Sequence, residues 1–150
     1  MKLPPARRAG FTLIELMIVV AIVAVLVAIA WPSFTNAVNK SRRSDAMSAL
    51  AQIMQAQERW RANNPSYQDT LANLPGASNG VSMAGHYDLS LLNGVTGSTY
   101  TAQASVHNGS PQSADSLCQT MQVTMNGGNI TYTSVDSGGT VTTPGPCWVQ

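Results

Sequence analysis

The chain has 150 residues, enough for one modest domain beside a membrane segment. Its net charge of +1 conceals an uneven distribution, because all eight Lys and Arg residues lie between Lys2 and Arg61. The rest of the chain is weakly acidic and has no basic patch, so its charge gives no support to nucleic-acid binding through phosphates.

An apolar run from Phe11 to Trp31 dominates the N-terminal part, interrupted only by Thr12 and Glu15. As a helix, it is long enough to span the roughly 30 Å hydrocarbon core of a bilayer. A carboxylate inside such a segment is costly and is therefore a candidate functional group. The sequence thus predicts a single membrane-spanning helix with one unusual charge, Glu15.

The short segment before this run carries Lys2, Arg7 and Arg8. Basic residues on this side predict a cytoplasmic N-terminus and an exported remainder. An ordinary cleaved secretory signal is the alternative interpretation. The apolar run is too long for it, and Ala28-Ile29-Ala30 is only a weak cleavage-site match.

A second helical segment, residues 33–63, follows Pro32. Pro32 removes one backbone N–H, so we expect a kink or local loosening of the helix there. Beyond it, side chains at helical spacing form an apolar stripe broken by one Gln, which predicts packing on the following domain rather than a binding groove. The stripe comprises Met47, Leu50, Ile53, Met54, Gln57 and Trp60.

Four charged residues lie just beyond the predicted membrane segment: Lys40, Arg42, Arg43 and Asp45. Lipid headgroups, neighbouring subunits and solvent are all plausible surroundings for them.

Residues 64–85 contain several Pro and Gly and predict a partly exposed connecting loop. Residues 86–150 then show alternating apolar and polar side chains in four stretches, 86–91, 100–106, 117–125 and 130–132. Asn-Gly pairs supply turns, with Asn126-Gly127 in a tight hairpin position. The fold class predicted is α+β, a long helix packed on a four-stranded antiparallel sheet, followed by a tail without strong secondary structure.

Cys118 and Cys147 lie beyond the membrane segment, in an oxidising compartment, and suggest one disulfide; two free thiols are the alternative. No catalytic, cofactor or metal site is predicted. The G-x-S-x-G match at residues 76–80 lacks the flanking strand and helix that a nucleophile elbow needs. His86 and Asp88 share one strand face, which is more typical of an exposed polar surface than of a catalytic pair.

The segment from Arg7 to Ile22 resembles the N-terminal signature of type IV pilins. It combines a basic leader, Gly10 before Phe11, Glu15 five residues after the glycine, and a long apolar tail. The specific match covers about residues 7 to 35. Beyond it the resemblance rests on the layout of helix, small β domain and late cysteine pair, and the ending Pro146-Cys147-Trp148 resembles the type IVa, PilE-like group.

This resemblance implies that prepilin peptidase cuts between Gly10 and Phe11 and methylates the new N-terminus at Phe11. It assigns Glu15, with Thr12 beside it, to subunit assembly, in which the carboxylate pairs with the N-terminus of a neighbouring subunit. It also implies a disulfide-bounded C-terminal region. The expected organisation is a leader (1–10), a filament-core helix (11–32), an amphipathic helix (33–63), a loop (64–85) and a β domain (86–150).

The implied function is a major or minor structural subunit of a type IV pilus, which supports twitching motility, adhesion and in some systems DNA uptake. The subunit waits in the inner membrane with a cytoplasmic N-terminus and ends in an extracellular filament. Its implied partners are other pilin subunits, prepilin peptidase and the assembly machinery. Two alternatives stay open, a type II secretion pseudopilin and a membrane-anchored periplasmic binding or hydrolytic domain.

Overall fold

The computed structural model describes residues 10–77 and 80–148. One long helix precedes two short 3-10 helices and five strands. In chain order, these are α1 (Leu13–Arg61), η1 (Leu71–Asn73), β1 (Tyr87–Leu91), β2 (Thr99–Val106), η2 (Pro111–Ala114), β3 (Thr120–Asn126), β4 (Asn129–Val135) and β5 (Val141–Thr142). The chain divides into two compact units, residues 1–37 and 38–150, and the boundary falls inside α1.

The first unit contains the apolar part of α1. It is the one helix among the described residues that is long and apolar enough to cross a membrane. The hydroxyl of Thr12 accepts a hydrogen bond from the Glu15 amide at 3.2 Å and so caps the first turn. The helix continues through Pro32, and the Thr35 hydroxyl donates to the Pro32 carbonyl at 2.9 Å. The kink at Pro32 stays a prediction.

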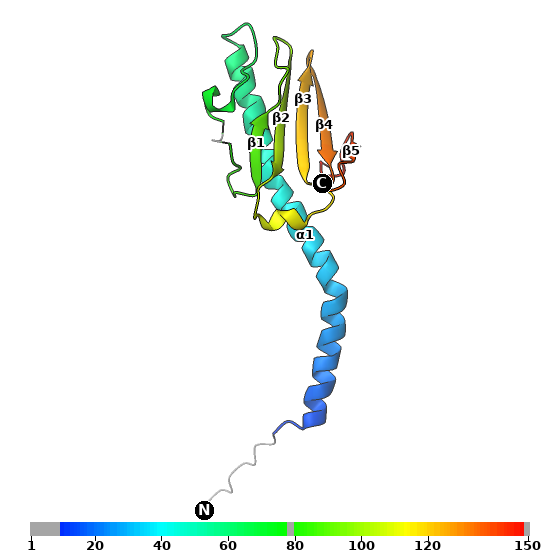
Figure 1. Ribbon diagram of the computed structural model, residues 1–150. Coiled ribbons are helices and arrows are strands. Elements are labelled where there is room, and N and C mark those ends of the chain that lie inside the picture. The colour runs from blue at the N-terminus through cyan, green and yellow to red at the C-terminus, as the bar shows by residue number, and fades with distance from the viewer. Residues whose placement is uncertain (1–9, 78–79, 149–150) are drawn as a thin grey trace, which may run out of the picture. The chain divides into compact units, whose positions relative to one another are not determined.

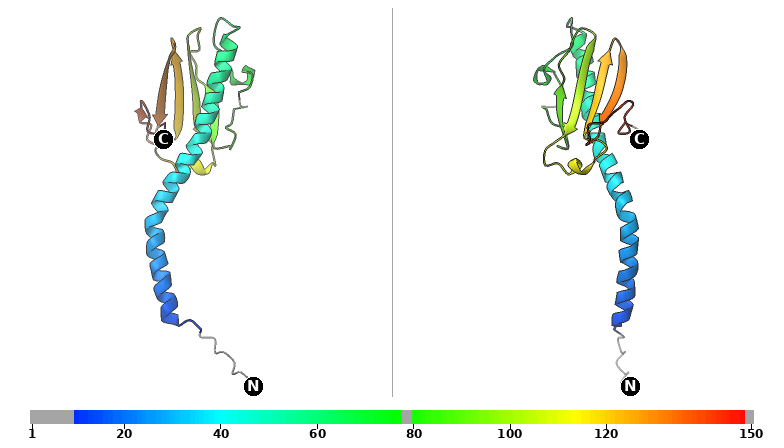
Figure 2. Two further views of the ribbon diagram at one scale, coloured as in Figure 1. Left: turned by 180° about the vertical axis from the view of Figure 1, so that it is seen from behind. Right: turned by 45° about the vertical axis from the view of Figure 1, so that its right-hand side comes forward.

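The second unit is a five-stranded antiparallel sheet in the order β1-β2-β3-β4-β5, with the second part of α1 crossing one face. Figures 1 and 2 show this helix against a single side of the sheet, while the opposite side has no helix over it. The strands follow one another as antiparallel neighbours, so all sheet contacts are between consecutive strands. This arrangement confirms the predicted α+β fold.

The core of this unit lies between α1 and strands β1 to β3. Alanines are frequent on both of its sides, which lets the helix lie close to the sheet. The larger fully buried side chains between them include Leu50, Ile53, Tyr87, Tyr100, Met121 and Val123. The predicted apolar stripe on the helix is thus largely a core surface.

The sheet differs from the prediction in three details. It has a fifth strand, β5, in the tail expected to lack structure, and this strand pairs Val135 with Val141. The third strand begins at Thr120 rather than Leu117, because the Cys118 amide turns back to the Asp115 carbonyl. The β3–β4 hairpin turns at Gly127-Gly128, both with positive φ, rather than at Asn126-Gly127.

Candidate functional site

The N-terminal part of α1 presents an apolar surface that the described residues leave exposed. Its large apolar side chains between Leu13 and Phe34 are each at least half exposed, and Phe11 is 86% exposed. An apolar surface of this extent in water marks a membrane or protein contact. The segment therefore needs cover from lipid or from other chains.

Glu15 lies in the first turn of this helix. The unpaired amides and the positive end of the helix dipole favour a carboxylate at this position. Gly10 and Phe11 immediately precede the turn, and among the described residues no heavy atom beyond those of Gly10 and its chain neighbours lies within 4 Å of where a Cβ on Gly10 would be. The structure therefore brings Gly10, Phe11, Thr12 and Glu15 together at one helix end. Residues 1–9, with the basic leader residues, lie outside the described residues.

The C-terminal tail is fixed by a disulfide between Cys118 and Cys147, whose Cα atoms are 5.8 Å apart. The predicted pair is therefore joined in the structure. Just before it, Gly145 lies against Ser134 of β4 so closely that a Cβ at Gly145 would clash with that side chain. Just after it, the Trp148 indole N–H donates to the Thr133 carbonyl at 2.9 Å, and its ring lies 4.9 Å from that of Tyr132.

Two of the charged residues beyond the membrane segment bind the chain's own β domain. The Arg43 guanidinium donates two hydrogen bonds, of 2.7 and 2.8 Å, to the Asp115 carboxylate, which is 3% exposed. The Asp45 carboxylate accepts from the Ser82 hydroxyl and the Ala84 amide. Headgroups, neighbouring subunits and solvent were the expected surroundings, and for Arg43 and Asp45 this is wrong, because their partners are loops of the same domain.

Gln57 interrupts the apolar stripe for a structural reason. Its side chain is fully buried, and its amide group both donates to and accepts from the Gln68 backbone, at 2.8 and 2.9 Å. These bonds fasten the start of the connecting loop to α1. The sequence signal for this role is one Gln at a core position, since a buried amide needs partners.

Two core tyrosines, Tyr87 and Tyr100, differ from Gln57 in their hydrogen bonding. Among the residues that the structure describes, neither the Tyr87 nor the Tyr100 hydroxyl makes a hydrogen bond of normal geometry, although the Gln112 side chain lies beside the Tyr87 hydroxyl and opposes the rise in its pKa. Burial raises the pKa of Tyr87 to about 12, with a smaller contribution from the negative charge of Asp115. Burial likewise raises the pKa of Tyr100 above the usual value.

The residues considered for catalysis do not assemble into a catalytic site. Asp88 pairs with Nδ1 of His107 at 2.6 Å, whereas Nδ1 of His86 lies 3.3 Å from the Ser110 hydroxyl. Residues 78–79 of the G-x-S-x-G match lie outside the described residues. Within the described ranges, no group of three or more His, Cys, Asp or Glu side chains is placed to hold a metal.

These features define a class of protein, an α+β domain carried on an exposed apolar helix. Two family models match the chain. The prokaryotic N-terminal methylation motif matches residues 5–31, and the type IV minor pilin ComP, DNA uptake sequence receptor, matches residues 32–122.

Curated relatives are pilins as well. The chain is 44% identical to the type IV major pilin protein PilA of Myxococcus xanthus over 63 residues, which is 42% of this chain and 29% of that one. It is 30% identical to the fimbrial protein EcpC of Eikenella corrodens over 118 residues, which is 67% of this chain and 77% of that one. A fimbrial protein of Neisseria meningitidis is 32% identical over 108 residues, 66% of this chain and 58% of that one.

The chain belongs to the type IV pilin family. The aligned region spans less than a third of the Myxococcus relative and about three quarters of the Eikenella relative. The methylation motif and the apolar helix fit a pilin that is anchored in the inner membrane and assembled into an extracellular pilus. The family is one of structural subunits, not a class of enzymes.

Proposed function

We propose that the chain is a structural subunit of a type IV pilus, stored in the inner membrane and assembled after removal of residues 1–10. The observation that carries this proposal is the exposed apolar helix with Glu15 in its first turn. Lipid covers this helix before assembly, and the helices of other subunits replace lipid afterwards. Small side chains such as Ala21, Ala24 and Ala28, which share a helix face, allow close packing of such helices.

Maturation creates the partner that Glu15 needs. Cleavage between Gly10 and Phe11 leaves an ammonium group on Phe11, which keeps its positive charge after N-methylation. Glu15 then lies about 6 Å along the helix axis from that end. Because an unpaired charge in an apolar environment is costly, the carboxylate favours a staggered neighbour whose N-terminus lies beside it. Glu15 therefore sets the register between subunits, and the Thr12 cap holds the first turn in place.

The variant Glu15→Ala tests this role. It keeps the apolar helix, so membrane insertion stays at the wild-type level, while the yield of sheared filaments falls at least tenfold. Glu58→Ala is the matched control, because Glu58 is an exposed carboxylate of α1 outside the apolar run. A normal filament yield from Glu15→Ala overturns the assigned role.

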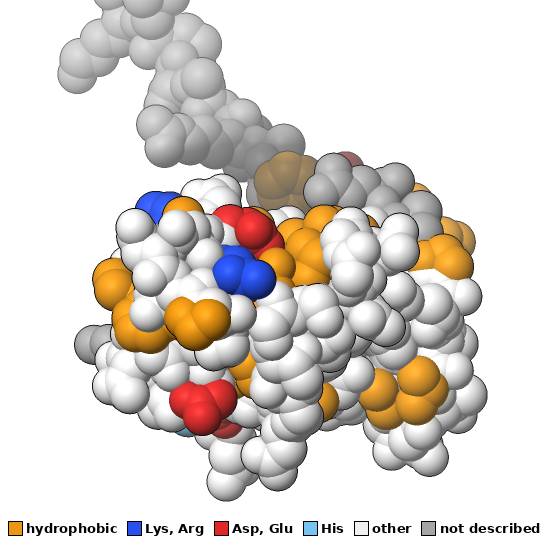
Figure 3. Space-filling view, turned by 90° about the horizontal axis from the view of Figure 1, so that it is seen from above, with side chains coloured by type: hydrophobic (Ala, Val, Ile, Leu, Met, Phe, Trp, Pro, Cys, Tyr) orange, Lys and Arg blue, Asp and Glu red, His pale blue; other side chains and the backbone are white. Residues whose placement is uncertain are grey.

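DNA uptake is a second candidate function, favoured by the family model of a DNA uptake sequence receptor. The charges restrict where DNA would bind, because no Lys or Arg follows Arg61. Arg43 is already bound to Asp115, and Arg61 donates to the carbonyls of Gly97 and Asn64. Figure 3 shows few blue atoms on the face that it presents, which is mostly white with several orange patches.

Phosphate contacts would therefore come from Lys40, Arg42 and Arg59. Duplex binding by the full chain at low and moderate salt tests this candidate, because each phosphate contact contributes about −0.9 to the slope of log K against log salt. Replacing all three cations by Gln removes the binding if this candidate is correct. Binding that survives the replacement places the DNA site elsewhere.

The type II secretion alternative calls for a genetic comparison. Deletion of the gene abolishes twitching and leaves protein secretion intact if the chain is a pilus subunit. The opposite pattern assigns it to secretion.

A further inference from the structure

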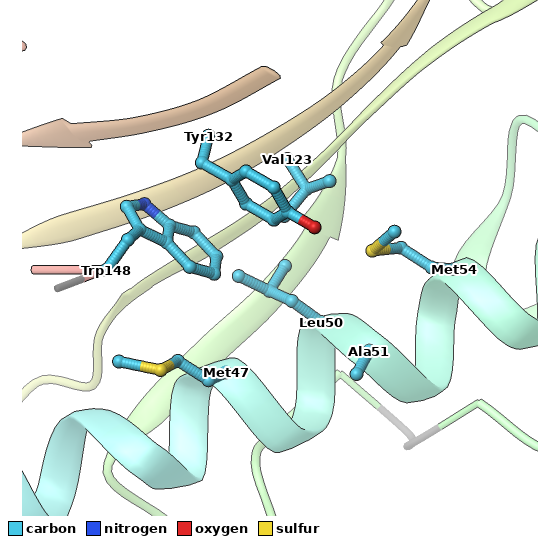
Figure 4. Close-up of a pocket in the computed structure, with 7 residues that line it drawn as sticks. All are labelled: Met47, Leu50, Ala51, Met54, Val123, Tyr132 and Trp148. Carbon is cyan, nitrogen blue, oxygen red and sulfur yellow. The ribbon is translucent and has the colours of Figure 1, made fainter. Parts of the chain in front are cut away.

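An apolar groove lies between α1 and the β4 edge of the sheet face that α1 packs on. All the residues that line it belong to the unit of residues 38–150. The groove has a volume of about 300 Å³. Figure 4 shows Met47, Ala51 and Met54 on the helix side, with Tyr132 and Trp148 facing them from β4 and the tail. Leu50 and Val123 complete the lining, and none of the seven lining residues is charged.

The groove exists because α1 does not cover the whole inner face of the sheet. Register pairs Met125 with Ile130 and Val123 with Tyr132, so the two β4 residues lie on the same face as buried β3 residues. Yet Ile130 is 41% exposed and Tyr132 is 37% exposed. Further along β4, Ser134 is buried beneath the tail at Gly145. Within the described residues, the inner face is thus covered by α1 on β1 to β3 and by the tail at one end of β4, where Trp148 reaches the Tyr132 ring, and Ile130 and Tyr132 between them stay partly exposed.

The chemistry of the lining defines an apolar, side-chain-sized occupant. The indole N–H of Trp148 is already bonded to the Thr133 carbonyl, so it offers no donor to a ligand. Two methionines provide flexible, polarizable contacts that favour aromatic rings. Tyr132 and Trp148 add ring faces and edges for offset or edge-to-face packing. The volume is at the lower limit of ligand pockets and suits one or two large side chains.

The chain carries a matching pair of aromatic side chains. Trp31 and Phe34 are 65% and 67% exposed. They lie three residues apart on α1 and therefore on one side of the helix. Trp31 ends the apolar run and Phe34 follows it, so both lie near the outer boundary of the membrane before assembly and lose that apolar surrounding when a subunit enters a filament.

We propose that the groove of one copy receives Trp31 and Phe34 of a second copy in the filament. This inference rests on the proposed pilus function. The contact is heterologous, because a groove on one subunit receives a different surface of the next, and contacts of this type build open helical filaments. It supplies the missing cover of β4 and removes two aromatic rings from water in a single step.

A photo-cross-linking amino acid in the groove tests this contact in assembled filaments. p-Benzoylphenylalanine replaces Met54 in the full chain, and labelled and unlabelled copies are mixed so that links between copies are recognised by mass. The expected product joins position 54 of one copy to the segment containing Trp31 and Phe34 of another. The same photo-cross-linker at Thr101, on the opposite face of the sheet, gives no link to that segment.

Filling the groove gives an independent measurement. Ala51→Trp occupies it from an exposed position on α1, and we expect at least a tenfold loss of filaments with an unchanged melting temperature of the subunit. Ala84→Trp is the control, placed on an exposed loop outside the groove. The photo-cross-link does not depend on this variant, so it decides the question even where Ala51→Trp fails to fold.

The outcomes separate the inference from the function on which it rests. Filaments that form while position 54 links to another segment, to a lipid or to a different protein overturn the inference and leave the pilus function intact. A wild-type chain that never enters filaments overturns both.

Discussion

The two halves of α1 carry similar apolar side chains but meet different surroundings. Ile29 is 73% exposed, whereas Ile53, in the same helix, is fully buried beneath the sheet. The first half therefore depends on lipid or on other subunits for cover, and the second half forms a core with its own domain. We infer that folding of the domain depends on the second half of α1 alone, a separation of tasks that leaves the first half for anchoring and, under the proposed function, for contacts with other subunits.

The largest expected effect is on the free energy of unfolding, compared between one substitution in each half of α1. Ile53→Ala removes a buried side chain and lowers the free energy of unfolding by about 4 kcal/mol, because it leaves a cavity in the core. Ile29→Ala changes the free energy of unfolding of the same domain by less than about 0.5 kcal/mol. Denaturant unfolding of the full chain in detergent, followed by tryptophan fluorescence, measures both. Equal effects of the two substitutions contradict the separation of tasks.

The disulfide lies in the domain that packs on the second half of α1, so its removal sharpens the comparison. Cys118 and Cys147 are 29 residues apart, and opening this loop lowers the free energy of unfolding by about 3.5 kcal/mol in the chain-entropy account. The double variant Cys118→Ser, Cys147→Ser is measured against wild type under the same conditions. Membrane insertion is the control and stays unchanged. An unchanged unfolding midpoint argues against a stabilising role for this bond.

The smallest effect concerns the buried tyrosines and pH. Burial raises the folded-state pKa of Tyr87 to about 12, above the unfolded value near 10. Its contribution is therefore fully present below about pH 10 and is lost as pH rises toward 12, because only the unfolded state then releases the proton. The expected loss is at most about 1.4 kcal/mol per pH unit for this group.

Tyr87→Phe provides the matched control for this pH dependence. Its hydroxyl makes no hydrogen bond of normal geometry among the described residues, and the Gln112 side chain merely lies beside it, so the substitution changes stability little at pH 7. It reduces the loss of stability above pH 10, and the raised pKa of Tyr100 accounts for part of the loss that is left. Unfolding curves recorded across this range check both statements. If the free energy of unfolding of the variant falls with pH above 10 as steeply as that of wild type, groups other than Tyr87 cause the loss.

The sequence predicted what depends on periodicity and on local motifs. The apolar run, the stripe around Leu50 and Ile53, and the alternation in strands β1 to β3 each follow from side-chain spacing. The pairing of Cys118 with Cys147 followed from the absence of other cysteines and from the family resemblance. The role of Gln57 was not predicted, because its partner, the Gln68 backbone, is set by the path of the loop.

Features that depend on tertiary contacts were missed for the same reason. The partners of Arg43 and Asp45 lie far along the chain, so charge and position alone suggested headgroups or solvent. The two-residue strand β5 is too short to show alternation. The groove was not predicted either, since Met47 and Met54 fit a core stripe by their spacing. They lie at the edge of the core only because α1 covers β1 to β3 and not β4.

The mass of the chain recovered from sheared filaments tests the central claim most directly. The account predicts that the chain is present in those filaments with the mass of residues 11–150, carrying one disulfide and one added methyl group on Phe11. Recovery of the chain only from membranes, with residues 1–10 still attached and no methyl group, contradicts the account.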